Sequence, residues 1–279
     1  MKAINIERLS FQFEHQDPVI NGLDMCIEAG EEALIIGPSG CGKSTLLKLI
    51  AGSLPKYGGQ VTAGQIRRAT VNQHPIRMGM LFQDPAMQFA MDTPRHELEF
   101  TLENCQVAPG QMPARIQEAS TFGQIGDLLD RKITTLSGGQ QQKVALAVVM
   151  AMHPDLLLLD EPFAAIDEHN RQFLIQQLVR WRAAQPGRTL IVTDHDCHGY
   201  ATLSPHVFRF VAGKLTALTP AQGAAVIKRA DATASTPLQV SVPATTAPAI
   251  IRLNDVKISR GNRELLTIPD LAIIKNKIT

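Results

Sequence analysis

Two periods of apolar residues alternate along the first 220 residues of the chain, one typical of strands and one typical of helices. Alternation of apolar and polar positions predicts a half-buried strand over Ala3–Phe13. A second strand is predicted over Val19–Ile27, after a turn at Asp17 and Pro18. The four leucines of Leu156–Leu159 are typical of a strand buried on both faces of a parallel sheet. Further strands are predicted at Ala33–Ile36, Met78–Phe82 and Thr189–Thr193, followed by a closing hairpin over residues 207–218.

Helical patterns lie between these strands. Leu46–Ala51 is the apolar part of a first helix, and the pattern is helical from Thr93 to about Met152, with an interruption near Pro109–Pro113. Over Glu168–Ala184 the apolar residues recur at spacings of three and four, as on one face of a helix. Alternating strands and helices predict an α/β fold.

The composition changes after Lys228. The stretch "ATASTPLQVSVPATTAPA" has no helical period and too little apolar bulk for a core, so we expect residues 229–249 to be an extended linker. Beyond it, "AIIRLNDVKI" resembles "AINIERLSF" near the N-terminus, and Arg263–Thr279 resembles Asp17–Ala33. The likeness is one of pattern with few identities, and a chance pairing of two amphipathic strands is the alternative.

Charge and cysteine content exclude few functions. The net charge of +1 gives no indication of a nucleic-acid or membrane partner. The four cysteines are widely scattered, which suits a reducing compartment better than a disulfide framework. The N-terminus lacks the apolar core of a signal peptide, and no apolar run approaches the roughly 20 residues of a membrane helix. We expect a chain that is soluble by itself and needs a partner for any role at a membrane.

The motif "GPSGCGKST" fits the phosphate-loop pattern GxxxxGK[ST] and lies between a predicted strand and a predicted helix. A triphosphate needs many N–H donors and little steric bulk, which glycines and a helix N-terminus supply. Lys43 would neutralise the β- and γ-phosphates, and the Ser44 hydroxyl would bind Mg²⁺. The predicted ATP-binding residues are Gly37, Pro38, Ser39, Gly40, Cys41, Gly42, Lys43, Ser44 and Thr45.

The motif "LLLLDEP" places two carboxylates at the end of a buried strand. Asp160 can hold Mg²⁺, mostly through water, and Glu161 is placed to polarise an attacking water molecule. Such a pair at a strand end can also be purely structural, but its position downstream of a phosphate loop favours the catalytic interpretation.

The motif "LSGGQ" precedes the apolar helix Val144–Met152 and forms a second helix N-terminus suited to phosphate. One nucleotide needs one phosphate loop, so a second cradle in the same chain indicates a shared site. The alternative is an ordinary N-cap with flexible glycines. The residues of this motif are Leu136, Ser137, Gly138, Gly139 and Gln140.

With these three motifs in this order, the sequence resembles the ATP-binding-cassette (ABC) ATPase family over about residues 2–220. The resemblance implies an α/β P-loop NTPase cassette, with a RecA-like core and mixed sheet, an antiparallel β-subdomain and a helical signature subdomain. It also implies that two cassettes pack head to tail, as a homodimer or heterodimer, so that the LSGGQ of each closes the ATP site of the other. ATP and Mg²⁺ are the cofactors it implies.

Further positions follow from the same resemblance. Phe13 matches the aromatic residue that stacks on adenine, where a tyrosine is more usual. Gln83 matches the glutamine that touches Mg²⁺ and the attacking water, so Ser44, Gln83 and Asp160 are the expected Mg²⁺ ligands. Asp167 matches the aspartate that crosses the dimer interface, and His195 matches the histidine that contacts the γ-phosphate. Glu161, His195 and Gln83 are thus the expected catalytic residues.

The segment "FQDPAMQFAMDTPRHELEFTLEN" is similar to that of energy-coupling-factor (ECF) transporters, with Gln88 as the matching second glutamine. This resemblance implies an ATP-binding subunit of an importer of a vitamin or a metal ion. Its partners would be integral membrane coupling and substrate-binding subunits, with no nucleic acid. The chain would lie in the cytoplasm, peripheral on the inner face of the cell membrane.

The expected organisation is a cassette over residues 1–228 with its helical subdomain at about 84–152, a linker at 229–249, and a truncated start of a second cassette at 250–279. Two alternatives remain open. One is a soluble, non-transport ABC ATPase, against which the neutral linker and the short distance from Gly37 to Asp160 argue. The other is a truncated remnant that binds ATP but does not turn it over alone.

Two smaller clusters carry no predicted function. The stretch "HDCH" over His195–His198 has metal-ligand residue types, but a zinc site normally needs a second pair of ligands. Arg67 and Arg68 are expected to be a solvated surface pair.

Overall fold

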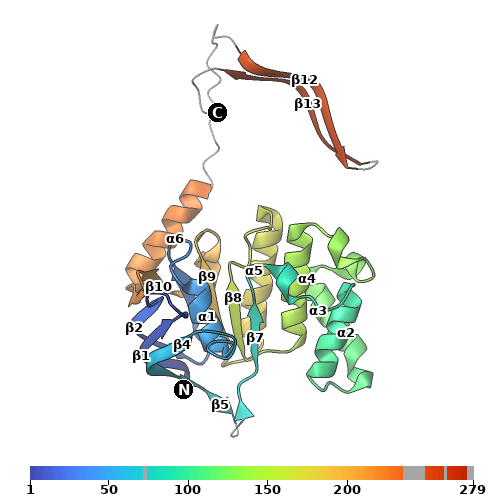
Figure 1. The fold of residues 1–279 in the computed structure, drawn as a ribbon. Coiled ribbons are helices and arrows are strands. Elements are labelled where there is room, and N and C mark those ends of the chain that lie inside the picture. Colours follow the sequence, from blue (N-terminus) through green and yellow to red (C-terminus); the bar gives the residue numbers. More distant parts are fainter. Residues whose placement is uncertain (72–73, 235–248, 261–262, 275–279) are drawn as a thin grey trace. The chain divides into compact units, whose positions relative to one another are not determined.

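The computed structural model describes residues 1–71, 74–234, 249–260 and 263–274. The chain divides into two compact units, Met1–Thr236 and Pro237–Thr279, which are described separately. The first unit contains three layers of packed elements (Figure 1).

A six-stranded sheet forms the centre of the first unit, in the order β11-β10-β3-β9-β8-β7. All neighbours pair in parallel except the edge strand β11, which pairs antiparallel with β10 and confirms the predicted hairpin. In β8, Leu156 and Leu158 face one core while Leu157 and Leu159 face another, as four successive leucines predict. The strands are β3 (Glu32–Ile36), β7 (Met78–Leu81), β8 (Leu156–Asp160), β9 (Thr189–Asp194), β10 (His206–Val211) and β11 (Lys214–Ala217).

A separate antiparallel sheet has the order β2-β1-β4 and includes β1 (Lys2–Gln12) and β2 (Ile20–Glu28). The sequence does not predict β4 (Gln60–Arg68), because most of its residues are polar and exposed. Pairing with the free edge of β1 makes this segment a strand. A small two-stranded sheet follows, with β5 (Thr70–Val71) and β6 (His74–Pro75).

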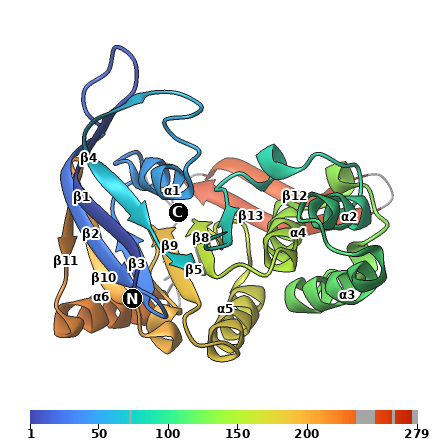
Figure 2. The ribbon, with the colours of Figure 1, turned by 90° about the horizontal axis from the view of Figure 1, so that it is seen from below.

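Helices cover both faces of the central sheet. The helix α1 (Lys43–Ala51) packs in one core with β1 and β2, whereas α4 (Gly138–Ala151) and α5 (Glu168–Ala183) pack in the core on the other face. A third core joins α4 to α2 (Pro94–Asn104) and α3 (Met112–Gly123), as predicted for the helical subdomain. These three helices and the β1–β2–β4 sheet lie on opposite sides of the first unit (Figures 1 and 2). Short 3₁₀ turns occur at Pro85–Gln88, Pro109–Gln111, Gly126–Leu128, Ile133–Thr135 and Tyr200–Leu203.

The helix α6 (Pro220–Ala234) crosses the predicted start of the linker. Residues 229–234 are therefore helical, whereas residues 235–248 of the expected linker lie outside the described residues. The composition explains the difference, because alanine has the highest helix propensity. Ile227 anchors the helix by packing against the core of the central sheet.

Arg68 is not a solvated surface residue. Its half-buried guanidinium donates hydrogen bonds to the carbonyl oxygens of Ile50 at 2.6 Å and Leu49 at 2.7 Å, at the C-terminal end of α1. Carbonyls at a helix C-terminus lack the usual acceptor role within the helix and carry negative potential, so a cation stabilises them, here beside the N–H of the C-cap Gly52 that also reaches the Leu49 oxygen. Burial lowers the pKa of Arg68. The prediction of an exposed pair is wrong for Arg68, while Arg67 is largely exposed beside Glu7.

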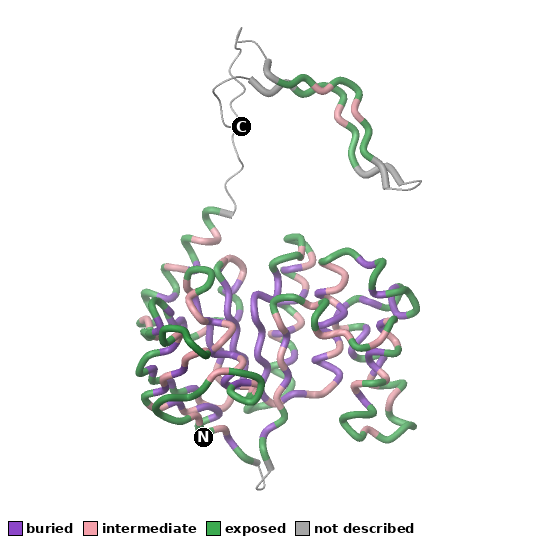
Figure 3. The backbone as a smooth tube through the Cα atoms, viewed as in Figure 1, coloured by how far each residue is buried: buried purple, intermediate pink, exposed green. Residues whose placement is uncertain are grey.

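The described part of the second unit is an antiparallel hairpin of β12 (Ala249–Arg260) and β13 (Arg263–Ile274). Its described side chains are exposed or intermediate, in contrast to the buried central strands of the first unit (Figure 3). Residues 275–279 of the expected second cassette lie outside the described residues. Across the described ranges, no helix combines the length and the hydropathy that crossing a bilayer requires.

Leu158→Ala should strongly destabilise the first unit. Leu158 is 0% exposed at the middle of β8, and removing a buried leucine side chain typically costs about 2–5 kcal/mol through lost burial and a cavity. Urea unfolding followed by Trp181 fluorescence measures the loss. The control is Val211→Ala, because Val211 is 48% exposed and should change stability by less than about 0.5 kcal/mol. Equal effects of the two substitutions would contradict the central position of β8.

Candidate functional site

The loop between β3 and α1 depends on glycines at three positions. Gly40 and Gly42 have φ angles of 76° and 110°, which residues other than glycine rarely adopt. A Cβ on Gly42 would lie 2.8 Å from Val19 Cγ1, and a Cβ on Gly37 would lie 2.2 Å from the Phe210 carbonyl oxygen. Glycine therefore favours this path at all three places, most strictly at Gly37, where the close contact is with backbone.

The N-terminus of α1 and the end of this loop line a cavity. Gly42 is the N-cap, and no side chain caps the helix and no acidic residue lies in its first turn. The first amide groups of a helix have no intrahelical acceptor, so they suit an anion. The cavity measures about 310 Å³. Its lining residues are Phe13, Gln16, Val19, Ser39, Gly40, Gly42, Lys43, Ser44, Thr45, Gln83 and Glu161.

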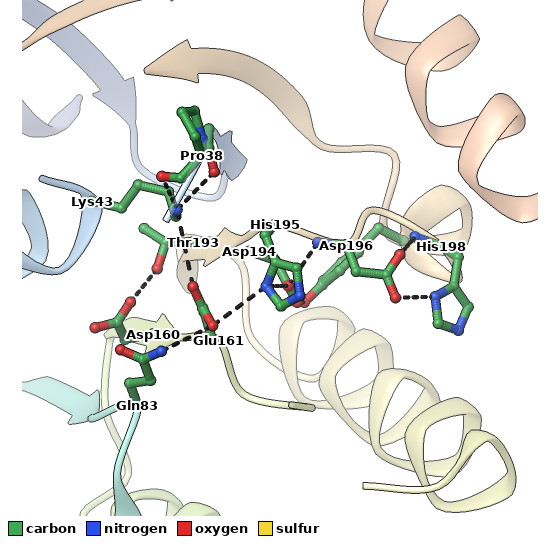
Figure 4. A network of polar contacts seen from close by, with 12 residues as sticks. Pro38, Lys43, Gln83, Asp160, Glu161, Thr193, Asp194, His195, Asp196 and His198 are labelled. Carbon is green, nitrogen blue, oxygen red and sulfur yellow. Dashed lines mark hydrogen bonds and ion pairs between the residues drawn. The ribbon is translucent and has the colours of Figure 1, made fainter. Parts of the chain in front are cut away.

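Lys43 is 5% exposed and holds the loop together. Its Nζ donates to the carbonyl oxygens of Gly37 at 2.8 Å and Pro38 at 3.1 Å. The same ammonium lies 3.9 Å from Glu161 Oε1 (Figure 4). The lysine therefore lies between the loop and the carboxylate that follows β8.

Glu161 and the two side chains that approach it, Gln83 and His195, each follow a different parallel strand. Gln83, after β7, donates from Nε2 to Glu161 Oε2 at 3.1 Å, and His195 Nδ1, after β9, lies 3.4 Å from the same oxygen. The Glu161 N–H donates to the Thr193 carbonyl oxygen at 2.8 Å. Glu161 itself has a φ of 46°, a sparsely populated conformation that often marks functional positions. The structure thus brings together the three expected catalytic residues (Figure 4).

Asp160 is buried and is oriented by Thr193. The Thr193 hydroxyl donates to Asp160 Oδ1 at 2.6 Å, which leaves Oδ2 of the carboxylate for another interaction. Oxygen ligands suit Mg²⁺, so the carboxylate of Asp160, the hydroxyl of Ser44 and the amide oxygen of Gln83 form a fitting donor set. The sequence missed Thr193 because an ordinary strand threonine gives no functional signal. It also missed Gln16 and Val19, whose place on the cavity depends on the path of the β1–β2 loop.

The segment after β9 is held by a polar network. Asp194 is buried, which raises its pKa, and it accepts hydrogen bonds from the Tyr200 hydroxyl at 2.8 Å and the Asp196 N–H at 3.0 Å. Arg171 of α5 donates to the His198 carbonyl oxygen at 2.8 Å. Both ring nitrogens of His198 face carboxylates, those of Asp196 and Glu168. The cluster around "HDCH" thus positions the loop that carries His195.

The LSGGQ stretch lies apart from the phosphate-loop cavity. The Gln140 N–H donates to Ser137 Oγ at 3.3 Å and the Ser137 N–H donates to Gln140 Oε1 at 2.9 Å, so the two residues form a capping box on α4. A Cβ on Gly139 would lie 2.6 Å from the Ala165 carbonyl oxygen, so this glycine permits a close backbone approach. None of residues 136–140 lines the cavity, although all are among the described residues.

Asp167 is exposed and also lies outside the cavity lining. It caps α5, because its Oδ1 accepts the Asn170 N–H at 3.0 Å. Both motifs expected at a cassette interface therefore lie at helix N-termini that are capped within the chain, with Ser137, Gly138 and Asp167 exposed.

Two residues of the ECF-like segment support the backbone around Gln83. Gln88 Oε1 accepts the Phe82 N–H at 2.8 Å, and its Nε2 donates to the Met80 carbonyl oxygen at 3.1 Å. Glu97 is buried and accepts the N–H groups of Ala90 and Met91, both at 2.8 Å. This segment is thus held against β7 and α2 by its own polar side chains.

A protein-family model described as "ABC transporter" matches residues 20–164, about half of the chain. The chain therefore belongs to the ABC transporter family, as an ATP-binding subunit. Members of this family bind and hydrolyse ATP in general. Within the family the chain resembles the ECF type.

Curated relatives support this placement. The chain is 36% identical to the energy-coupling factor transporter ATP-binding protein EcfA1 of Leuconostoc mesenteroides, over 74% of this chain and 76% of the relative. It is 35% identical to the putative HMP/thiamine import ATP-binding protein YkoD of Bacillus subtilis, over 72% of this chain and 38% of that relative. A putative ABC transporter ATP-binding protein of Streptomyces avermitilis is 32% identical over 85% of this chain and 41% of its own length. The chain thus spans only about two fifths of the length of these last two relatives.

Solved structures agree with the fold. The structure of cbiO1 from Clostridium perfringens, described as part of the ABC transporter complex cbiONQ, has a TM-score of 0.68 and 25% identity, and covers 86% of this chain and 96% of that one. A bacterial Atm1-family ABC exporter with ATP bound has a TM-score of 0.62 at 22% identity, and covers 77% of this chain and 38% of that one. The second likeness concerns the fold alone. Together they confirm the predicted ABC-type α/β cassette.

Cys197 should be the slowest of the four cysteines to react with iodoacetamide at pH 8. Burial raises the pKa of its thiol to about 11, so very little of the reactive thiolate is present at that pH. Cys26 and Cys105 are exposed and provide internal controls in the same sample. Mass spectrometry of the alkylated peptides over time measures the order of reaction. Modification of Cys197 as fast as Cys26 would show that the segment after β9 opens readily.

Proposed function

We propose that this chain hydrolyses ATP as the ATP-binding subunit of an ECF-type importer. The observation that carries the proposal is the position of Glu161. Its carboxylate lies at the phosphate-loop cavity, between the ammonium of Lys43, the amide of Gln83 and the imidazole of His195. A carboxylate in this position can polarise a water molecule next to a bound γ-phosphate.

Substrate binding would use the loop and the start of α1. The amides from Ser39 to Thr45 and the Lys43 ammonium would bind the triphosphate, because both supply positive potential at an uncapped helix N-terminus. Phe13 lines the same cavity and would stack on adenine. Ser44, Asp160 and Gln83 would hold Mg²⁺, which neutralises the charge that develops on the phosphates.

The water-activating step would depend on the three strand ends. Glu161 would orient and polarise the attacking water, and His195 would contact the γ-phosphate. Gln83 would link the same water to the surface segment that follows β7. The left-handed backbone of Glu161 and its N–H bond to Thr193 keep the carboxylate in place before substrate binds.

A second cassette would complete the site, as a homodimer or a heterodimer. The support is that Ser137 and Gly138 of LSGGQ, together with Asp167, are exposed, and that the whole motif and Asp167 lie outside the chain's own phosphate-loop cavity. Their helix N-termini would instead face the nucleotide of the partner cassette. ATP binding would close such a pair, and hydrolysis would loosen it.

Coupling to a membrane subunit would use the surface beside Gln83. Met87 in this segment is 81% exposed, the highest value among the large apolar side chains whose burial the structure describes. An exposed apolar side chain held on a rigid 3₁₀ turn suits a docking contact. The chain would then lie on the cytoplasmic face of the membrane, beside integral membrane coupling and substrate-binding subunits. The cargo would be a vitamin or a metal ion, as the ECF resemblance implies, and the Bacillus subtilis relative is named as a putative HMP/thiamine import protein.

Lys43→Ala and Glu161→Gln should separate binding from hydrolysis. Lys43→Ala should weaken ATP binding, because it removes the cation that faces the phosphates. Glu161→Gln should preserve ATP affinity but lower phosphate release by about 10²–10⁴-fold, the usual contribution of a general base. Calorimetry measures the affinity and a phosphate assay measures turnover. Undiminished turnover of Glu161→Gln, or unchanged affinity of Lys43→Ala, would refute the corresponding role.

The chain should co-sediment with membranes when it is expressed with its transporter partners. Met87→Asp should reduce the membrane-bound fraction, because it places a charge on the proposed docking contact. Tyr57→Asp is the matched control, because Tyr57 is 75% exposed in a different segment. Quantitative blotting of membrane and ribosome fractions measures the outcome. Recovery with ribosomes, or an equal effect of both substitutions, would contradict the proposed coupling.

A further inference from the structure

The two hairpins of the chain, β1–β2 and β12–β13, pair their strands in the same register. Paired residues of β12 lie 247 positions after their equivalents in β1, and those of β13 lie 246 positions after their equivalents in β2. Five of the six β1–β2 pairs recur with these offsets, and the sixth is displaced by one residue. The five recurring pairs of β1–β2 are Lys2–Glu28, Ile4–Ile27, Asn5–Cys26, Ile6–Met25 and Phe11–Ile20. Their equivalents in β12–β13 are, in the same order, Ala249–Ile274, Ile251–Ile273, Arg252–Ala272, Leu253–Leu271 and Ile258–Leu266.

An unusual backbone conformation recurs at the equivalent place. Arg8 in β1 has a φ of 47°, and Asp255 in β12, 247 positions later, has a φ of 49°. Only a few per cent of non-glycine residues adopt this left-handed conformation. A chance pairing of two amphipathic strands would reproduce the apolar pattern but not the position of such a residue. The two hairpins are therefore equivalent in backbone as well as in sequence pattern.

The two hairpins differ in the burial of their apolar side chains. On β1–β2, the side chains of Ile4, Phe11 and Ile20 are 0% exposed and that of Met25 is 3% exposed. They share a core with the apolar side of α1, and β4 pairs with the free edge of β1. The equivalent side chains of β12–β13 are 44–51% exposed; they belong to Ile251, Ile258, Leu266 and Leu271.

We propose that residues 249–274 are the first two strands of a second nucleotide-binding cassette, and that their apolar face binds a helix of the α1 type and a strand of the β4 type. An isolated two-stranded hairpin is marginally stable in water, so a stable fold requires other elements to pack against this apolar face. A nucleotide-binding role for the second cassette rests on the function proposed above. The equivalence of the two hairpins is independent of that function, because it rests on strand register and backbone conformation. A second copy of the first unit fits poorly, because its own α1 already buries Leu46, Leu47, Leu49 and Ile50.

A graft tests the proposal directly. In the full chain, residues 250–274 replace residues 3–28, so that each strand of the second hairpin takes the place of its equivalent. Most substituted core positions stay apolar and similar in volume, such as Ile4 by Ile251, Ile6 by Leu253 and Met25 by Leu271, which cores tolerate well. Ala3 by Ile250 and Phe11 by Ile258 change the volume and should lower the stability somewhat. We expect cooperative urea unfolding, which is the readout of this test. The graft also replaces Phe13, Gln16 and Val19 of the cavity lining, so ATP affinity should fall and does not decide the comparison.

The matched control graft uses residues 249–273, which moves every side chain by one position. A one-residue slip turns each apolar side chain to the opposite face, so this variant should lose cooperative unfolding. Equal behaviour of the two grafts, including failure of both to fold, would overturn the proposal. If the parent chain binds no ATP, the proposed function fails, but the comparison of unfolding still decides the equivalence.

Sedimentation velocity tests the competing occupant, a second copy of the chain. We expect Leu271→Asp to leave the oligomeric state of the chain unchanged, as should the control Arg252→Asp on the other face of the hairpin. If Leu271→Asp dissociates a dimer that Arg252→Asp leaves intact, the apolar face binds another copy and the proposal is wrong.

Discussion

The pairing of β8 between β7 and β9 is the constraint on which the candidate site depends. The three strands run parallel, so their carboxyl ends meet at one edge of the sheet. Gln83, Glu161 and His195 follow these ends, and the two neighbours reach one oxygen of Glu161 at 3.1 and 3.4 Å. The pairing is secured by leucines buried on both faces of β8. Burial in the core thus sets the geometry of polar groups at the edge.

Helix N-termini serve two different purposes in this protein. The start of α1 has no side-chain cap, so its amide groups remain available to an anion in the adjoining cavity. The helices α4 and α5 are capped by Ser137 and Asp167 within the chain. Their exposed position suits contact with a second cassette rather than with the chain's own cavity. This difference supports the proposed division of each ATP site between two cassettes.

The two hairpins show that strand pairing and burial are determined separately. Backbone register and the left-handed residue recur almost unchanged from β1–β2 to β12–β13. Cover by α1 and β4 is present for the first hairpin, whereas the apolar side chains of the second are about half exposed. An amphipathic hairpin can therefore specify its own pairing, but the elements that pack against it decide whether its apolar face becomes a core.

The sequence by itself determined most strands and helices of the first unit and the phosphate loop, and its resemblance to the ABC family indicated Gln83 and His195 as the residues that gather around Glu161. The elements and the phosphate loop depend on local patterns, such as apolar periodicity and glycine spacing, whereas Gln83 and His195 carry a signal only through the family resemblance. Only the tertiary structure showed that β4 is a strand, that Arg68 caps α1, that Thr193 orients Asp160, and that Gly139 approaches Ala165. In every such case the partner is distant in sequence, and the residue itself carries no local signal. The contacts arise because the sheets and the helices pack into three adjoining cores, and that packing decides which distant groups meet.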